Sequence, residues 1–175
     1  GHVDVIKVLL EGLTHEDRLT CLHKANNDGV TLLHFAAIKG HVDVIKVLLE
    51  GLTHEDRLAF LHKANNDGVT PLHFAAFKGN VDVIKVLLEG LTDEARLTYL
   101  HKTNNDGKTP LFIAAQNRRV NVIKELLEGL SHEERLEYLS MAQHDGSTPL
   151  HIATLYSYTN IVNILNQAES HEGIT

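Results

Sequence analysis

The sequence contains no tryptophan and only one cysteine among its 175 residues. Because Cys21 is alone, no disulfide can form within the chain, which is typical of a cytoplasmic or other reducing intracellular compartment. No apolar run approaches the roughly 20 residues that a membrane-spanning helix needs. The chain has 16 lysine and arginine residues against 23 aspartate and glutamate residues, so its net charge is −7. Phosphate backbones and anionic membranes repel such a chain, and we expect no nucleic-acid and no membrane partner.

Motifs of catalysis are also missing. There is no glycine-rich phosphate loop, no Ser-His-Asp order and no pair of histidines flanking a glutamate. We therefore expect no enzyme activity and no cofactor. The chain is nevertheless 43% hydrophobic and 22% charged, which is enough apolar material to build a folded core.

A repeat of 39 residues dominates the sequence. Residues 1–39 and 40–78 differ at four positions only. Fixed periods of this size are typical of solenoids, in which each unit packs against its neighbours. Asp-Gly pairs mark the step, beginning at Asp28, Asp67, Asp106 and Asp145. We expect one array over 1–175, with a partial repeat at 1–25, repeats at about 26–64, 65–103 and 104–142, and a terminal repeat at about 143–175.

Each repeat predicts a turn and three short helices. In residues 65–103, Gly68 suits a turn, and Thr70 is placed to cap a helix over about 71–78 that Gly79 ends. A second helix over about 81–89 has an apolar stripe too wide for one neighbour to cover. Thr92 and the acidic residues after it predict a third short helix over about 93–102.

The heptapeptide Thr70-Pro71-Leu72-His73-Phe74-Ala75-Ala76, followed by Gly79, resembles the ankyrin repeat. Related segments begin at Thr31, Thr109 and Thr148, so the resemblance covers essentially the whole chain. It implies an all-α ankyrin-repeat solenoid. The usual ankyrin period is 33, and we expect the six additional residues to form the extra short helix in place of the family's β-hairpin finger.

Three substitutions depart from the ankyrin pattern. Phe112 replaces the histidine of the heptapeptide in the third copy. Arg118 and Ser157 replace the glycine that ends the first helix. We expect Asn117 to take the left-handed conformation that this glycine would otherwise adopt.

Three ladders of equivalent residues could carry chemistry. His34, His73 and His151 recur one per repeat, too far apart to share a metal ion, and the resemblance implies a structural role beside the helix cap. Each of the four equivalent arginines follows acidic residues, so we expect solvated or inter-repeat ion pairs; they are Arg18, Arg57, Arg96 and Arg135. Cys21 shares a position with Phe60, Tyr99 and Tyr138, which indicates packing surface rather than a nucleophile.

The predicted function is protein binding, because the resemblance implies an extended concave surface made of turns and the outward positions of the first helices. Several of these positions are unusually apolar, so either a partner or the third helices must cover them. The candidate partner-binding residues are Val30, Ile38, Lys39, Asn66, Asp67, Val69, Phe77, Lys78, Lys108, Gln116, Asn117, Leu155 and Tyr156.

Alternative functions remain open at this point. The chain could be a spacer or targeting arm of an enzyme, or of a secreted bacterial effector delivered into a host cell, whose active domain lies outside residues 1–175. It could also be a self-associating array, although we expect a monomer. Residues 2–9 copy residues 41–48 and lack a polar outer face, which favours a piece of a longer protein.

The histidine ladder generates a first prediction, that the protein holds no stoichiometric metal. Metal ligands must lie about 2 Å from one ion, whereas equivalent residues of stacked helices lie about 8–10 Å apart. Elemental analysis after dialysis should therefore find far less than one zinc per chain. About one zinc per chain would contradict the prediction.

Overall fold

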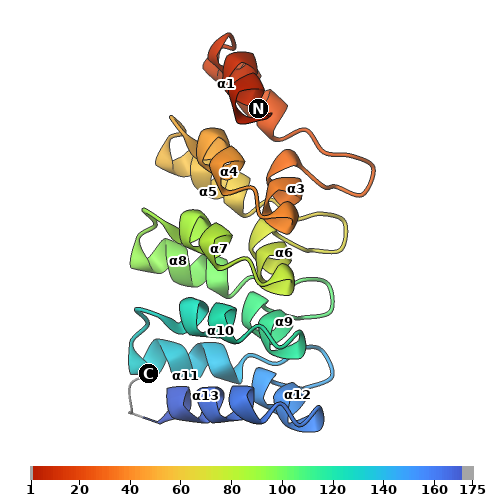
Figure 1. The fold of residues 1–175 in the computed structure, drawn as a ribbon, viewed down its shortest axis with the longest axis vertical. Helices are drawn as coiled ribbons and strands as arrows, with labels where there is room; N and C mark the ends of the chain where they lie inside the picture. Colours follow the sequence, from red (N-terminus) through yellow and green to blue (C-terminus); the bar gives the residue numbers. More distant parts are fainter. Residues whose placement is uncertain (1, 171–175) are drawn as a thin grey trace.

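The computed structural model describes residues 2–170, which form thirteen helices stacked along one long axis (Figure 1). Within these residues the one β pairing is an isolated bridge between Ala25 and Thr31. None of the helices is long and apolar enough to cross a bilayer. In chain order the helices are α1 (His2–Glu11), α2 (His15–Leu22), α3 (Leu32–Lys39), α4 (Val42–Leu49), α5 (His54–Leu61), α6 (Pro71–Lys78), α7 (Val81–Leu88), α8 (Asp93–Leu100), α9 (Pro110–Gln116), α10 (Val120–Leu127), α11 (His132–Ser140), α12 (Pro149–Leu155) and α13 (Thr159–Glu169).

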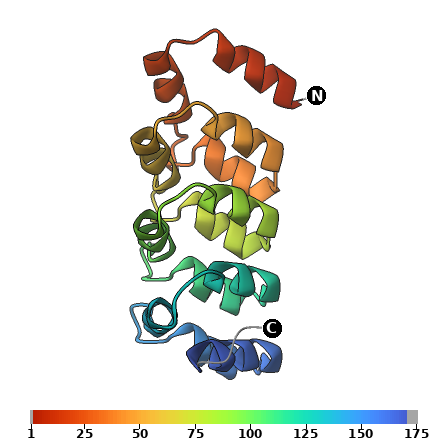
Figure 2. The same ribbon diagram turned by 90° about the vertical axis from the view of Figure 1, so that its left-hand side faces the viewer.

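The helices form three parallel columns. The inner helices α3, α6, α9 and α12 lie beside the turns that project at the right-hand edge of Figure 1. The outer helices α4, α7, α10 and α13 pack against them, and α1 packs against α4. The third helices α2, α5, α8 and α11 form a separate column, seen at the left of Figure 2. The predicted third helix is thus confirmed, with α8 ending at Leu100 rather than near residue 102.

The inner helix α6 begins and ends where its sequence motif predicts. Thr70 and His73 form a capping box at the start of α6, and Pro71 occupies the first turn, where an amide hydrogen is not needed. Gly79 ends the helix with φ +86°, a left-handed conformation that favours glycine.

The two inner helices without this glycine end differently from the prediction. Asn117 keeps a negative φ of −99°. The left-handed residues are Arg118, with φ 58°, and Ser157, with φ 56°. The expectation for Asn117 was therefore wrong. The chain must reverse at the same point of every repeat to place the outer helix. The residue at that point therefore adopts the left-handed conformation whatever its side chain.

The third helices belong to the core. Thr92 caps α8 by accepting a hydrogen bond from the Ala95 backbone amide, and the side chains of Tyr99 and Leu100 are completely buried. Tyr138 of α11 is also fully buried, and its hydroxyl accepts a hydrogen bond from the Leu111 amide of α9 at 3.2 Å. The six extra residues per repeat therefore extend the core across the side of each inner helix.

Cys21 differs from its equivalents. Phe60, Tyr99 and Tyr138 are fully buried, whereas Cys21 is exposed. The difference follows from the neighbours, because α11 packs on the preceding inner helix of its own repeat and the described part of the chain has no inner helix before α1. The same cause exposes the apolar face of α1. Val8 is 69% exposed, while the equivalent Val47 of α4 is 6% exposed.

Three of the four equivalent arginines, Arg18, Arg57 and Arg96, join a third helix to the next repeat. One terminal nitrogen of Arg57 in α5 donates to the backbone carbonyls of Val86 at 3.1 Å and Glu89 at 2.7 Å, at the end of α7. Arg18 makes the same pair of bonds to Val47 and Glu50, and Arg96 donates to the Glu128 carbonyl at 2.6 Å.

The inter-repeat part of the prediction for these arginines is confirmed, but the acceptors are carbonyl oxygens rather than carboxylates. The cause is helix geometry, because the last carbonyls of an α-helix have no partner within the helix. They also lie at the negative end of its dipole, where a cation is favourable.

Replacing Arg57 tests this contact. Arg57→Ala removes two charge-assisted hydrogen bonds to otherwise unpaired carbonyls, and we expect the free energy of unfolding to fall by about 1.5–3 kcal/mol. Urea unfolding followed by circular dichroism measures the change. Glu89→Gln is the matched control, since it removes the carboxylate and keeps the carbonyl, and it should alter stability by less than about 0.5 kcal/mol. A larger effect of Glu89→Gln would show that an ion pair dominates instead.

Candidate functional site

The turns at the right-hand edge of Figure 1 form a continuous ladder from repeat to repeat. The Asn66 backbone amide donates to the Asp28 carbonyl at 2.9 Å, and the Asn66 side-chain amide donates to the Asn27 carbonyl at 2.9 Å. Gly29 lies at this junction with φ +78°, and a Cβ there would come within 2.7 Å of the Asn66 side chain. The turns are thus fixed in backbone position while the Asn66 and Asp67 side chains remain exposed.

The next column of candidates occupies one outward position of the four inner helices. Phe77 is 43% exposed and Leu155 is 72% exposed. Ile38 and Gln116 are half-buried. The third helices therefore do not enclose Phe77, because they bury the opposite flank of the inner helices, where Tyr99 lies.

The following residue of each inner helix forms a second column, and its members differ chemically. Lys39 and Lys78 are exposed, and the Lys78 ammonium lies 5.4 Å from the centroid of the Phe77 ring. Asn117 donates its side-chain amide to the Ile113 carbonyl at 2.8 Å, so it is occupied within its own helix. Tyr156 is 51% exposed and stacks on Tyr158 with the ring centroids 5.6 Å apart.

The candidates that directly precede the capping threonines are only partly accessible. Val30 and Val69 are half-buried. Lys108 is also half-buried, with its ammonium 3.5 Å from the Asp106 carboxylate and 5.9 Å from the centroid of the Phe112 ring. The structure therefore brings Phe77 and Lys78 together as accessible groups, and it engages Lys108 inside its own repeat.

Two members of the histidine ladder, His34 and His73, make inter-repeat hydrogen bonds, whereas His151 is exposed and bonds to Thr148 of its own repeat. Nδ1 of His73 accepts from the Thr70 backbone amide at 3.2 Å, and its Nε2 lies 3.0 Å from the Lys108 carbonyl of the next turn. His34 makes the same contacts with Thr31 and the Val69 carbonyl. A carbonyl only accepts, so Nε2 carries the proton and the ring is neutral.

Burial keeps these rings neutral. His73 is completely buried, and desolvation lowers its pKa to about 4 despite the hydrogen bonds to the Lys108 and Lys102 backbones, which raise it. Desolvation also lowers the pKa of His34. Within residues 2–170, no group of three or more histidine, cysteine, aspartate or glutamate side chains is arranged to hold a metal ion.

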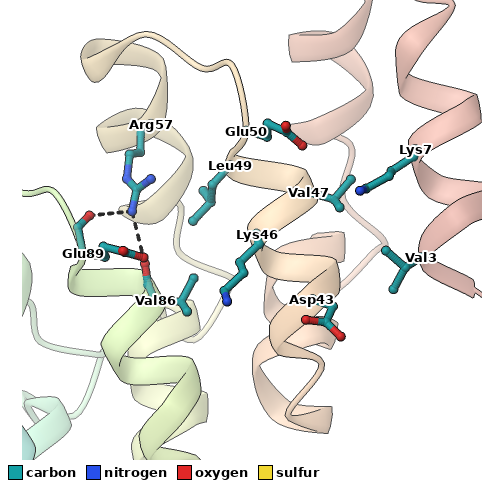
Figure 3. Close-up of a pocket in the computed structure, with 10 residues that line it drawn as sticks. All are labelled: Val3, Lys7, Asp43, Lys46, Val47, Leu49, Glu50, Arg57, Val86 and Glu89. Atoms are coloured by element: carbon teal, nitrogen blue, oxygen red, sulfur yellow. Dashed lines mark hydrogen bonds between the residues drawn. The ribbon is translucent and has the colours of Figure 1, made fainter.

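A hollow of about 530 Å³ lies on the other side of the stack, between α1, α4 and α7 (Figure 3). Lys46 and Arg57 line it together with Asp43 and Glu89, so both charges are present. The dashed lines in Figure 3 show that Arg57 is already bonded to the end of α7. This mixed lining contains no serine, cysteine or histidine.

The sequence analysis missed one group of basic residues. Arg118 and Arg119 lie in the loop between α9 and α10, beside Lys78 of the preceding repeat. Nε of Arg119 donates to the Phe77 carbonyl at 2.9 Å, and the Arg118 guanidinium lies 4.9 Å from the centroid of the Tyr158 ring. The signal was present in the sequence, because two arginines stand where the earlier repeats have Gly40-His41 and Gly79-Asn80.

Comparison with known protein families gives a direct match. The family model described as ankyrin repeats (3 copies) matches residues 1–99 and 90–173. A search of curated proteins finds no match to this chain. The helix-ending glycines and capping histidines are consistent with the matched family, whereas the third helix of each repeat is additional to the family's usual two-helix unit.

The buried histidine generates a prediction about pH. The pKa of His73 is about 4 when folded and near 6.5 when unfolded, so the unfolded chain binds more protons between these values. The contribution of His73 to the free energy of unfolding should be fully present above about pH 6.5. It should be lost as the pH drops toward 4, which lowers that free energy by about 3 kcal/mol.

His73→Phe isolates this effect, because the third repeat already carries Phe112 at the same position. Urea unfolding at about pH 7 and pH 4.5 compares the two proteins. The wild type should lose more stability than His73→Phe on acidification. An identical loss in both would contradict the assignment.

Proposed function

The chain belongs to the ankyrin-repeat family, and on that premise we propose that it binds a partner protein through the face made of its turns and inner helices. Ankyrin repeats are generally protein-interaction modules and are typically non-catalytic. Phe77 is the observation that carries the proposal for this chain. Phe77 shares its outward position with Ile38 and Leu155 of other repeats, and apolar groups that gather on one face are typical of interaction sites.

Phe77 is held on a rigid support. Its helix is capped at one end by the Thr70–His73 box and ends at the other in the left-handed Gly79. The Phe77 carbonyl accepts the hydrogen bond from Arg119 of the next repeat. Because little conformational freedom remains in this backbone, little is lost when a partner covers the ring.

The surroundings of Phe77 match the usual anatomy of an interface. Ile38 occupies the equivalent position one repeat earlier and is half-buried. Lys39 and Lys78 lie at the edge as exposed cations. Interfaces concentrate their binding energy in a few apolar or aromatic anchors that a polar rim surrounds. We assign Phe77 as the anchor and the two lysines as the rim.

Leu155 and Tyr156 provide a second apolar area on the last inner helix. They are separated from Phe77 by Gln116 and Asn117, which are half-buried and polar. A partner that follows the inner helices would therefore meet apolar, polar and apolar positions in turn. This order favours a partner segment with two separated apolar anchors.

Photo-crosslinking identifies the partner and its position at once. A photoreactive phenylalanine analogue at position 77 should capture the partner from a lysate, and mass spectrometry should identify it. The same analogue at Asp82, exposed on α7, is the control and should not capture that protein. Capture from position 82 alone would place the interface on the outer helices and contradict the proposal.

Substitution of Phe77 then measures how much this side chain contributes to the affinity for the partner. Phe77→Ala should weaken binding of the identified partner by about 2 kcal/mol or more, which is about 30-fold. Phe74→Ala is the matched control, because Phe74 is half-buried and packs edge-on against His34 with centroids 5.8 Å apart. That control should lower the melting temperature and leave the affinity of the folded protein unchanged. If Phe77→Ala instead lowered the melting temperature and left the affinity of the folded protein unchanged, Phe77 would be a packing residue.

A further inference from the structure

The loops that join inner to outer helices lie at the right-hand edge of Figure 2. A small cationic pocket lies between two of these loops. Its volume is about 270 Å³, and it is lined by Lys78, Gly79, Arg118, Arg119 and residues 120–122 of α10. Three of these residues are cations and none is acidic. In a chain of net charge −7, a pocket whose charged lining residues are all cations is a local reversal of the overall charge.

These cations are not neutralised by the protein. Among residues 2–170, no carboxylate forms an ion pair with Lys78, Arg118 or Arg119, although such pairs do form elsewhere, as between Lys85 and Glu125 at 3.6 Å. Unpaired cations that converge on one pocket generate a positive potential there. That potential is available to an incoming anion.

The two arginines are held in place by contacts that leave their charge accessible. Arg119 is bonded through Nε to the Phe77 carbonyl, and its Cδ would lie 3.0 Å from a Cβ at Gly79, so the glycine makes room for it. Arg118 rests against the Tyr158 ring. Arg118 also adopts φ 58°, where the two preceding repeats have glycine. An ordinary side chain in this conformation is unfavourable, so nothing in the backbone geometry explains an arginine there.

One further difference separates this loop from its equivalents. The second residue of α4 is Asp43 and that of α7 is Asp82, but the second residue of α10 is Asn121. The first turn of α10 therefore has no acidic residue, and its N-cap, Arg119, makes no side-chain capping bond. The positive end of the helix dipole adds to the three cations instead of being offset by a carboxylate.

We infer that this pocket binds a carboxylate from an acidic segment of the partner protein, next to the Phe77 anchor. The inference rests on the proposed function. Arginine side chains recognise planar carboxylates through paired N–H donors, and Lys78 connects the pocket with the Phe77 ring. A nucleic acid is disfavoured, because it would need a continuous basic track, and the chain offers one cluster within an acidic surface.

An NMR titration tests the pocket without knowledge of the partner. The probe is a deca-glutamate peptide, added to ¹⁵N-labelled protein of residues 1–175 at low ionic strength, where surface charges are least screened. We expect the Nε–H signals of Arg118 and Arg119 and the amide signals of residues 120–122 to shift. The Arg57 side chain is the internal reference and should not shift. A deca-glutamine peptide should produce no shifts.

Two substitutions remove the site with residues that the earlier repeats already tolerate. Arg118→Gly deletes a cation, and Asn121→Asp adds a carboxylate to the first turn of α10. Together they should weaken deca-glutamate binding at least about tenfold. Lys24→Gln with Asn163→Asp is the matched control, because both side chains are exposed and the net charge changes equally, to −9. The control should stay within about twofold of the wild type, since exposed charges far from the pocket are screened.

Other outcomes would overturn the inference. Equal weakening in both double variants would show that the peptide senses net charge only. Unchanged Arg118 and Arg119 signals would show that the pocket is not used. Tighter binding of a deca-thymidine oligonucleotide through the same signals would make the site a phosphate site. If Phe77→Ala abolishes partner binding and the Arg118/Asn121 variant does not, the proposed function stands and this inference fails.

Discussion

Hydrogen bonds that end on backbone carbonyls hold each repeat of this protein to the next, and most other features depend on them. His73 reaches the carbonyl of Lys108, Arg57 reaches the end of α7, and Asn66 reaches the preceding turn. These acceptors are present whatever the side chain at that position. The stack can therefore keep one geometry while the residues between the contacts change.

This separation of roles explains how the same scaffold carries a varied surface. Four positions differ between the nearly identical residues 1–39 and 40–78, and one of them, Ile38 against Phe77, points outward from an inner helix. Farther along, Arg118 and Arg119 replace the residues that end and follow the helix without altering the course of the chain. An aromatic ring and a group of cations thus lie side by side on one frame, to which Arg119 adds a hydrogen bond of its own through the Phe77 carbonyl. A partner with an apolar anchor and a nearby carboxylate would complement both.

Much of the fold could be predicted from the sequence, because its signals are local. Thr70, Pro71 and Gly79 define the limits of α6 within a few residues, and Thr92 marks the start of α8. Where the prediction was wrong, the cause was a contact outside the repeat. Arg57 follows acidic residues in sequence, yet its hydrogen bonds run to the carbonyls of the next outer helix. Asn117 has the side chain best suited to a left-handed residue, yet the path of the chain assigns that conformation to Arg118.

The candidate site shows the same division. By itself the sequence determined that the chain repeats, where each helix begins, that the protein is acidic, and which residues occupy equivalent positions, because composition and period are properties of the chain alone. Only the tertiary structure decided that Phe77 is exposed while Lys108 is engaged within its own repeat. It alone brought Lys78 beside Arg118 and Arg119, which are about one repeat apart in sequence. The physical reason is that the exposure of a side chain and the electrostatic potential around it depend on neighbours from other repeats. The sequence of a single repeat does not determine which residues those neighbours are.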